Sequence, residues 1–248
     1  MSRPGSKTYS FQIQPQEVDF QYRITLASLT NILLNAAGFN ADDNGFGMRT
    51  LQANNSSWVL LSMAIEMDHY PTQYENIEVD TWIEDVRRAV TTRNFRIINA
   101  EGTTIGWGCS LWAMINMQTR RAMDLTLLEG IHQFASGDGI PMDKPLRLGE
   151  LEGEAVDQFR TRYSHIDINN HVNSMRYVEW VSDCLSLDLY RDKHIARFEI
   201  NYLNEVLFND EVRIFANEIA AGDYRFEIKK VDKTACRARI VLVDKPTK

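Results

Sequence analysis

A run of polar residues at 165–173 holds the side chains best suited to chemistry in this sequence. Within HIDINNHVN lie Asp167, Asn169 and His171. A carboxylate and an imidazole are common groups for acid–base or nucleophilic catalysis, and an amide can orient water or donate to an oxyanion. Each residue also has a simpler interpretation, because Asn169 or Asn170 could cap a helix and Asp167 could form a turn.

Metal and disulfide chemistry have no support in the sequence. It contains no HExxH motif and no paired Cys/His spacing typical of metal ligands. Its three cysteines, Cys109, Cys184 and Cys236, are far apart and odd in number. We therefore expect no metal or other cofactor, no disulfide framework, and a reducing compartment.

The elements around the polar run are a strand and a helix. Residues 159–168 have a strand pattern, and 171–187 have a helical pattern in which Tyr177, Trp180 and Val181 share one face. Four more strand patterns follow, at 194–203, 210–220, 224–232 and 234–244. The helix therefore begins at the polar run, and its N-terminal N–H groups could stabilise an oxyanion near His171.

The same order of elements occurs earlier in the chain. A strand pattern at 9–20 leads to a helical pattern at 24–39, which is expected to end at Gly38. After a polar loop at 40–57, four strand patterns follow, at 57–70, 75–86, 91–102 and 103–117. This repetition predicts an α+β protein with two tandem strand–helix–antiparallel-meander units, each with a sheet wrapped around its helix, forming a pseudo-dimer.

A stretch rich in turn-forming residues separates the two halves. Residues 135–154, ASGDGIPMDKPLRLGELEGE, lack periodicity and are rich in glycine and proline. The predicted organisation is therefore an N-terminal unit at 1–134, a linker at 135–154 and a C-terminal unit at 155–248.

The overall charge and hydropathy restrict the class of protein. The formal net charge is −7 and the pI is about 5.3, which argues against nucleic acid or an anionic membrane as the main partner. No window approaches 18 consecutive apolar residues, and the first residues show no secretory signal. We expect a cytoplasmic protein without a membrane span.

Several segments resemble one known family. The motif DxNxHVN at 167–173 is similar to the signature of plant plastid acyl-acyl-carrier-protein thioesterases and their bacterial relatives. Further similar segments lie at 58–71, 79–85, 110–123 and 203–212, so the resemblance covers most of the chain. It implies a double hotdog fold, with hydrolysis of fatty acyl-carrier thioesters to free fatty acid, ending chain elongation.

The resemblance also implies a set of site residues. The catalytic pattern of the family falls on Asp167, Asn169, His171 and Glu205. Many plant members have a cysteine directly after the glutamate, but this chain has Val206, which excludes a cysteine nucleophile there. Of these four residues, only the aspartate has an identical counterpart in the first half of the chain, Asp19. Gln21 and Arg23 replace the amide and the imidazole, and the segment near Pro71 replaces that of Glu205. The second half is therefore expected to be the catalytic one.

Two chemical routes to thioester hydrolysis remain open. Asp167 could attack the carbonyl and form a mixed anhydride, or Glu205 could activate a water molecule. His171 could orient a carboxylate or protonate the leaving sulfur, and Asn169 could position the water. A fatty chain needs a long apolar pocket, and Trp58, Met63, Trp112 and Met114 are the candidate lining residues.

The expected partner is an acyl carrier protein, an acidic protein that a basic patch would attract. The candidate basic pairs are Arg87/Arg88, Arg120/Arg121 and Arg191/Lys193. The alternatives are an acyl-CoA thioesterase of the same fold and a non-catalytic acyl-thioester sensor. The chain could be a monomer or a homodimer.

Overall fold

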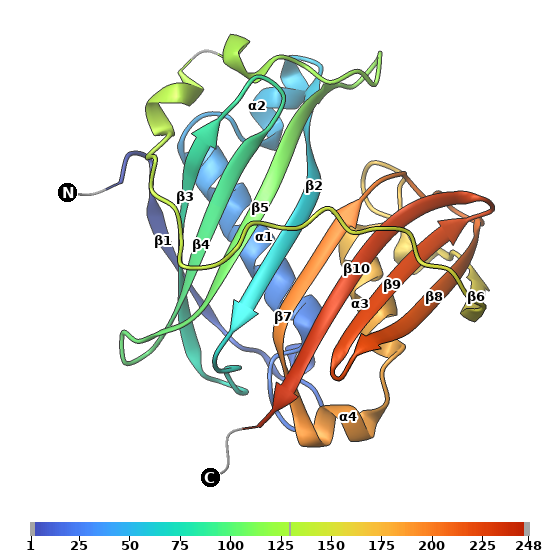
Figure 1. Cartoon of the computed structure of the whole chain (residues 1–248). Helices are drawn as coiled ribbons and strands as arrows, with labels where there is room; N and C mark the ends of the chain where they lie inside the picture. The colour runs from blue at the N-terminus through green and yellow to red at the C-terminus, as the bar shows by residue number, and fades with distance from the viewer. Residues whose placement is uncertain (1–2, 129, 246–248) are drawn as a thin grey trace. The chain divides into compact units, whose positions relative to one another are not determined.

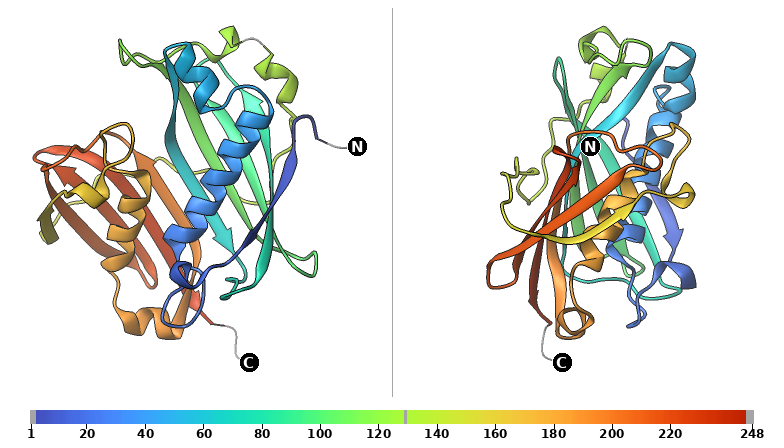
Figure 2. Two further views of the ribbon diagram at one scale, coloured as in Figure 1. Left: turned by 180° about the vertical axis from the view of Figure 1, so that it is seen from behind. Right: turned by 90° about the vertical axis from the view of Figure 1, so that its right-hand side faces the viewer.

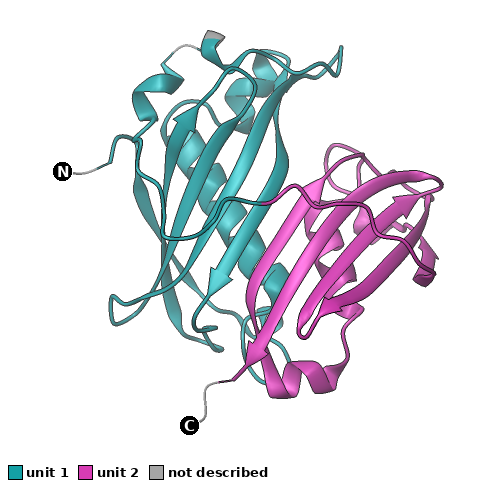
Figure 3. Cartoon of the chain, in the orientation of Figure 1, with its two compact units in different colours: residues 1–145 teal, residues 146–248 magenta. Residues whose placement is uncertain are grey.

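The computed structural model describes residues 3–128 and 130–245. It consists of two compact units, Met1–Pro145 and Leu146–Lys248 (Figure 3). The division between them falls inside the segment 135–154 that the sequence indicates as a linker.

Unit 1 is a five-stranded antiparallel sheet with a long helix on one face (Figures 1 and 2). The strand order is β1-β3-β4-β5-β2. The strands are β1 (Lys7–Gln12), β2 (Ser56–Met67), β3 (Asn76–Val86), β4 (Thr91–Asn99) and β5 (Thr104–Asn116). The helices are α1 (Leu26–Asp43) and α2 (Met48–Ala53), with short 3₁₀ turns η1 (Pro15–Glu17), η2 (Leu125–Leu127) and η3 (Ile131–Phe134).

Helix α1 is longer than the sequence pattern predicts. It begins where the Thr25 hydroxyl accepts a hydrogen bond from the Ser28 N–H at 3.1 Å. The expected end at Gly38 is wrong, because α1 continues to Asp43. Asn40 and Ala41, beyond the glycine, are buried, and their burial offsets the roughly 1 kcal/mol that an interior glycine costs. The expected polar loop at 40–57 therefore contains the end of α1 and all of α2.

Unit 2 repeats the plan of unit 1, with strand order β7-β10-β9-β8-β6. The strands are β6 (Ala155–Arg160), β7 (Lys193–Tyr202), β8 (Glu211–Ala220), β9 (Asp223–Lys230) and β10 (Lys233–Asp244). The helices are α3 (Ser174–Asp183), on one face of the sheet (Figure 2), and α4 (Leu187–Asp192), with the 3₁₀ turn η4 (Tyr163–His165). The α+β composition and the repeated order of elements are confirmed. In each unit the meander has three strands, and the first strand after the long helix, β2 or β7, lies beside the last strand, β5 or β10.

Two predicted boundaries in unit 2 are wrong. The strand expected at 159–168 ends at Arg160, and the 3₁₀ turn η4 replaces its second part. The helix expected at 171–187 begins only at Ser174 and is interrupted after Asp183. Ser186 starts α4 by accepting a hydrogen bond from the Leu189 N–H at 3.3 Å, because serine favours a helix N-cap over a helix interior.

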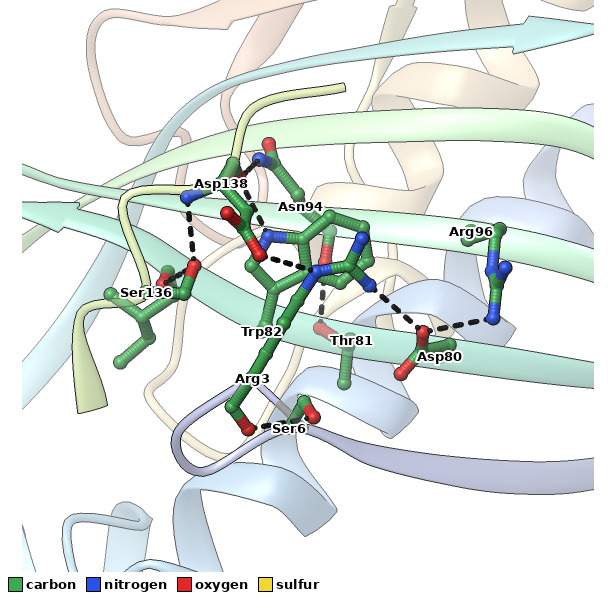
Figure 4. Close-up of polar contacts among 10 residues, drawn as sticks. Arg3, Ser6, Asp80, Thr81, Trp82, Asn94, Arg96, Ser136 and Asp138 are labelled. Atoms are coloured by element: carbon green, nitrogen blue, oxygen red, sulfur yellow. Dashed lines mark hydrogen bonds and ion pairs between the residues drawn. The ribbon is translucent and has the colours of Figure 1, made fainter. Parts of the chain in front are cut away.

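The first part of the linker lies on the unit 1 sheet through specific contacts (Figure 4). The Trp82 indole N–H donates to the Asp138 carbonyl at 2.8 Å, and the Asn94 side chain donates to the same carbonyl at 3.2 Å. The Arg3 guanidinium stacks 3.9 Å above the Trp82 ring and donates to the Asp138 carboxylate at 3.0 Å. The buried Trp82 therefore has a partner both for its ring and for its N–H.

The second part of the linker lies on the unit 2 sheet. The N–H groups of Leu146 and Leu148 donate to Glu199 at 3.1 Å and to Asn201 at 2.8 Å. The Leu151 N–H donates to Glu227 at 2.7 Å. Buried backbone donors need acceptors, and here side chains of the sheet supply them in place of a neighbouring strand. Within the described residues, no helix has both the length and the apolar character of a membrane span.

Candidate active site

The polar run forms a tight turn organised by Asp167. The Asp167 N–H donates to the His171 carbonyl at 2.8 Å. The Asp167 Oδ1 accepts hydrogen bonds from the backbone N–H of Asn169 at 2.8 Å and of His171 at 3.3 Å. Asn170 has a φ of 61°, a left-handed conformation that asparagine tolerates better than most residues. The carboxylate of Asp167 therefore shapes the backbone that carries His171.

One short antiparallel bridge closes this turn, and a second attaches it to the segment after β7. One joins Ile166 to Val172, and the other joins His171 to Leu207. The Val172 N–H also donates to the Val206 carbonyl at 2.8 Å. These contacts fix the register between the turn and residues 205–207.

This register brings two of the predicted catalytic side chains together. The His171 Nε2 lies 3.2 Å from the Glu205 Oε2, with side-chain exposures of 25% and 49%. Asn169 is exposed, and Asp167 is half-buried. The structure thus forms an imidazole–carboxylate pair that is accessible to water. The turn that carries the imidazole is held by the other carboxylate, that of Asp167.

Helix α3 begins later than the polar run. Its N-cap is Asn173, whose Oδ1 accepts from the Met175 N–H at 2.9 Å. The Arg176 N–H donates to the Asn173 carbonyl at 2.9 Å. The interpretation of Asn169 or Asn170 as the helix cap is therefore wrong. Because these two N–H groups are occupied, the Ser174 N–H is the remaining candidate for an oxyanion donor in the first turn of α3.

Unit 1 contains the same turn with different side chains. The Asp19 Oδ1 accepts from the N–H groups of Gln21 at 2.8 Å and Arg23 at 3.0 Å. The Asp19 N–H donates to the Arg23 carbonyl at 2.7 Å, and Tyr22 has a φ of 62°. The agreement with the turn at Asp167 indicates that the aspartate is retained in both units for its backbone contacts.

The two turns differ in what surrounds the aspartate. In unit 1 the Arg23 guanidinium pairs with the Asp19 carboxylate at 3.1 Å. The Ile24 N–H donates to the Pro71 carbonyl at 2.9 Å, so Pro71 corresponds to Val206 and Tyr70 to Glu205. Unit 1 therefore has an ion pair and a tyrosine where unit 2 has the His171–Glu205 pair.

Two other titratable side chains, His165 at the start of the polar run and Cys184 after it, have contacts that fit a structural role. The His165 ring contacts the rings of Phe159 and Trp180, and its Nδ1 accepts from the Arg162 N–H at 3.1 Å. Burial, followed by the charges of Arg176 and Arg162, lowers the pKa of His165. Burial raises the pKa of the Cys184 thiol to about 11, so it is not a thiolate near neutral pH. In the described part of the chain, no cluster of His, Cys, Asp and Glu could hold a metal ion.

Unit 1 contains an apolar cavity of about 180 Å³. Trp58 and Trp112 line it, whereas Met63 and Met114 are buried outside its lining. Met114 packs with Leu51 and Leu125 instead. The remaining lining residues come mainly from α1 and the facing strands: Leu34, Ala37, Gly38, Ala41, Phe46, Met48, Ile83, Thr91 and Arg93.

Both tryptophans present apolar surface to this cavity. The Trp58 indole N–H donates to the Phe46 carbonyl at 2.9 Å, and the Trp112 indole N–H donates to the Ser110 hydroxyl at 2.8 Å. The small residues of α1 and Arg93 were not among the lining residues predicted from the sequence. The signal for the former was a run of Ala and Gly on one helix face, which leaves room beside large aromatic residues.

Comparisons with known proteins cover both units. A model of the acyl-ACP thioesterase N-terminal domain matches residues 6–127, and one of the C-terminal domain matches residues 149–244. A chloroplastic acyl-[acyl-carrier-protein] hydrolase of Cuphea viscosissima is 26% identical over 211 residues, covering 79% of this chain. A palmitoyl-acyl carrier protein thioesterase of Arabidopsis thaliana is 24% identical over 214 residues. The chain spans about half of the length of these plant relatives, 51% in each case.

Solved structures show the same fold. The crystal structure of an acyl-ACP thioesterase from Bacteroides thetaiotaomicron is 40% identical in sequence, with a TM-score of 0.92, over 96% of this chain and 98% of that one. A 12:0-ACP thioesterase from Umbellularia californica has a TM-score of 0.86 at 21% identity, over 99% of this chain and 100% of that one.

Proposed function

The chain belongs to the acyl-ACP thioesterase family and has its double hotdog fold, and we propose that it hydrolyses fatty acyl thioesters of acyl carrier protein. The products would be a free fatty acid and the carrier thiol. The observation that supports this best is the 3.2 Å pair of His171 and Glu205. Unit 1 has the same backbone turn without that pair, so the pair is not needed to build the turn.

The geometry favours activation of water over attack by Asp167. The half-exposed Glu205 can accept a proton from a water molecule as the water oxygen attacks the thioester carbonyl carbon. The C–S bond then breaks, and the proton returns through His171 to the leaving thiolate. The Asp167 carboxylate is engaged by two backbone N–H groups, which hydrogen-bond its charged form and reduce its strength as a nucleophile.

Variants of Asp167 test this assignment. Asp167→Asn keeps an oxygen that can accept from the turn, whereas Asp167→Ala removes the acceptor. We expect the alanine variant to lose more activity, by about tenfold in kcat, because a misplaced catalytic group is costly. If Asp167 were the nucleophile, both variants would be equally inactive. Turnover in 18-O water followed by mass spectrometry of the protein should leave the Asp167 carboxyl unlabelled, because only the anhydride route labels it.

We propose that the unit 1 cavity holds part of the acyl chain. Its lining is largely apolar, and its volume of about 180 Å³ exceeds the ~150 Å³ cavity that holds a benzene molecule. Met63 and Met114 would then support the cavity from the core.

Replacing Trp112 with alanine is expected to shift the preferred acyl chain to a longer one. The change removes a large ring from the lining and leaves space that additional methylene groups can fill. The measurement is kcat/KM across a series of carrier-bound acyl chains. Trp107→Ala provides a control on the same strand, because Trp107 does not line this cavity. An unchanged chain-length profile in Trp112→Ala would contradict the cavity assignment.

Acyl carrier protein is the proposed partner, with the cytoplasm as the proposed compartment. Several candidate basic side chains already have acidic partners: Arg88 pairs with Asp124 at 2.9 Å and Lys193 with Asp244 at 2.6 Å. Such pairing reduces their attraction for an acidic partner. Arg121 is exposed, which makes it a candidate for steering the carrier.

The function is tested by thiol release from acyl-carrier thioesters of increasing chain length, with matched acyl-CoA thioesters alongside. Rapid release from the carrier series supports the proposal and gives the chain-length preference. Release only from acyl-CoA would identify an acyl-CoA thioesterase instead. Tight binding of acyl thioesters without release would identify a sensor.

A further inference from the structure

A buried cation lines the otherwise apolar cavity of unit 1. Arg93 lies on β4 and is 5% exposed. Ten other residues line the same cavity, none of them acidic or basic. A cavity shaped only for a hydrocarbon chain gains nothing from a buried guanidinium, because removing a charge from water is costly.

The position of Arg93 is fixed by a short hydrogen-bond chain. The Arg93 Nη1 donates to the Asn40 Oδ1 at 2.8 Å and to the Thr81 hydroxyl at 3.2 Å. The Asn40 amide donates in turn to the Gly5 carbonyl at 2.8 Å, and the Thr81 hydroxyl donates to the Asn94 carbonyl at 2.9 Å. Both acceptors therefore direct an oxygen lone pair at Arg93, and the guanidinium is held beside the cavity face of α1.

The guanidinium retains unused hydrogen-bonding capacity. Of its five N–H donors, the two on Nη1 account for the bonds to Asn40 and Thr81. Within the described residues, the Nε and Nη2 donors have no acceptor, and no carboxylate oxygen lies within 4.0 Å of Arg93. Burial lowers the pKa of Arg93 to about 10, so it remains charged near neutral pH.

We propose that this cavity binds acyl chains that carry an oxygen substituent away from the thioester, and that Arg93 determines this preference. The substituent would be a hydroxyl, oxo or carboxylate oxygen that accepts hydrogen bonds from the free Nε and Nη2 donors. The apolar lining would hold the adjoining methylene groups. This inference rests on the proposed function, because it specifies the substrate class of the same thioesterase.

The physical basis is the cost of leaving buried donors unpaired. An unsubstituted chain would cover the guanidinium without supplying an acceptor, whereas an oxygenated chain would satisfy it. A site built to bond an oxygen rejects the analogue without that oxygen more strongly than an apolar pocket distinguishes methylene groups. The preference should therefore be visible in substrates of equal chain length.

The test is hydrolysis of carrier-bound thioesters of one chain length, unsubstituted or bearing a hydroxyl, oxo or terminal carboxyl group at varied positions. For the wild type we expect kcat/KM to be about tenfold or more higher for at least one oxygenated chain than for the unsubstituted one. Arg93→Met should bring this ratio close to one. A preference for the carboxyl substrates would indicate an ion pair, and one for hydroxyl or oxo substrates a neutral hydrogen bond.

Arg96→Met is the matched control. Arg96 lies on the same strand but pairs with Asp80 outside the cavity, so the substrate ratio should be unchanged. Arg93→Lys, which keeps the charge, should retain part of the preference and serves if Arg93→Met does not fold. Equal or faster hydrolysis of the unsubstituted chain by the wild type would overturn the proposal and leave the proposed function intact.

A binding measurement distinguishes failure of the proposed function from failure of the cavity proposal. If no thioester is hydrolysed, the proposed function fails. Calorimetric titration of the free hydroxy, oxo, dicarboxylic and unsubstituted fatty acids into wild type and Arg93→Met then tests the cavity directly. Tighter binding of an oxygenated acid that depends on Arg93 would support the cavity assignment, and equal affinities would overturn it.

Discussion

Replacing His171 with alanine is expected to lower kcat for thioester hydrolysis by about 1,000-fold, within the range typical of positioned acid–base groups. The imidazole lies 3.2 Å from the Glu205 carboxylate, and in the proposed mechanism it passes the proton to the leaving sulfur. The turn should persist, because its bonds to Asp167 involve the backbone of residue 171. Single-turnover thiol release measures the effect on the chemical step.

Glu205→Gln should lower kcat by a similar factor, because an amide cannot accept the proton of the attacking water. If the two side chains act as one pair, the double variant should be little worse than either single variant. Arg23→Ala is the control, since Arg23 occupies the position of His171 in the unit 1 turn. Its kcat should stay within about twofold of the wild type. Additive losses in the double variant would contradict the pairing.

Replacing Glu199 with alanine is expected to lower the free energy of unfolding by about 3 kcal/mol, as for other buried ion pairs that lose one partner. Glu199 is fully buried and accepts from the Leu146 N–H of the linker. It also pairs with Arg197 at 2.8 Å and with Arg239 at 3.1 Å. Its loss would remove one carboxylate partner from each arginine and the acceptor of the Leu146 N–H. Urea unfolding measures the change.

The stabilisation by Glu199 should depend on pH. Burial alone would raise the pKa of Glu199, but hydrogen bonds and charge from Arg197, the Leu146 N–H and Arg239 outweigh it and lower the pKa. A lowered folded-state pKa gives stability that is present above the unfolded pKa of about 4.3 and is lost as the pH falls through the folded value. The difference in Tm between wild type and Glu199→Gln should therefore shrink below about pH 4.

Glu211→Ala is the control for the stability series. Glu211 is exposed and pairs with Arg160 at 3.5 Å, so its removal should cost less than about 1 kcal/mol. A Glu199 variant that unfolds like Glu211→Ala would show that the linker is not held through this carboxylate.

The sequence by itself determined the α+β class, the duplicated order of elements and the strand ranges of both meanders. These features follow from local periodicity, which burial on one face imposes along each segment. It also singled out the polar run, because Asp167, Asn169 and His171 are close in the chain, but it did not predict the turn that the run forms. Local pattern was less reliable at the ends of helices, as α1 passes through Gly38 and α3 begins at Ser174.

Only the tertiary structure decided which of these side chains meet. Glu205 reaches His171 because the bridge between His171 and Leu207 sets the register of two separate segments, and such pairings leave no periodic trace in a sequence. The same holds for the cavity, which includes Trp58 and Trp112 but not Met63 or Met114. The sequence does not point to Arg93, because it is a single arginine in a strand pattern and belongs to no motif. Its burial between Asn40 and Thr81 depends on the packing of α1 against the sheet.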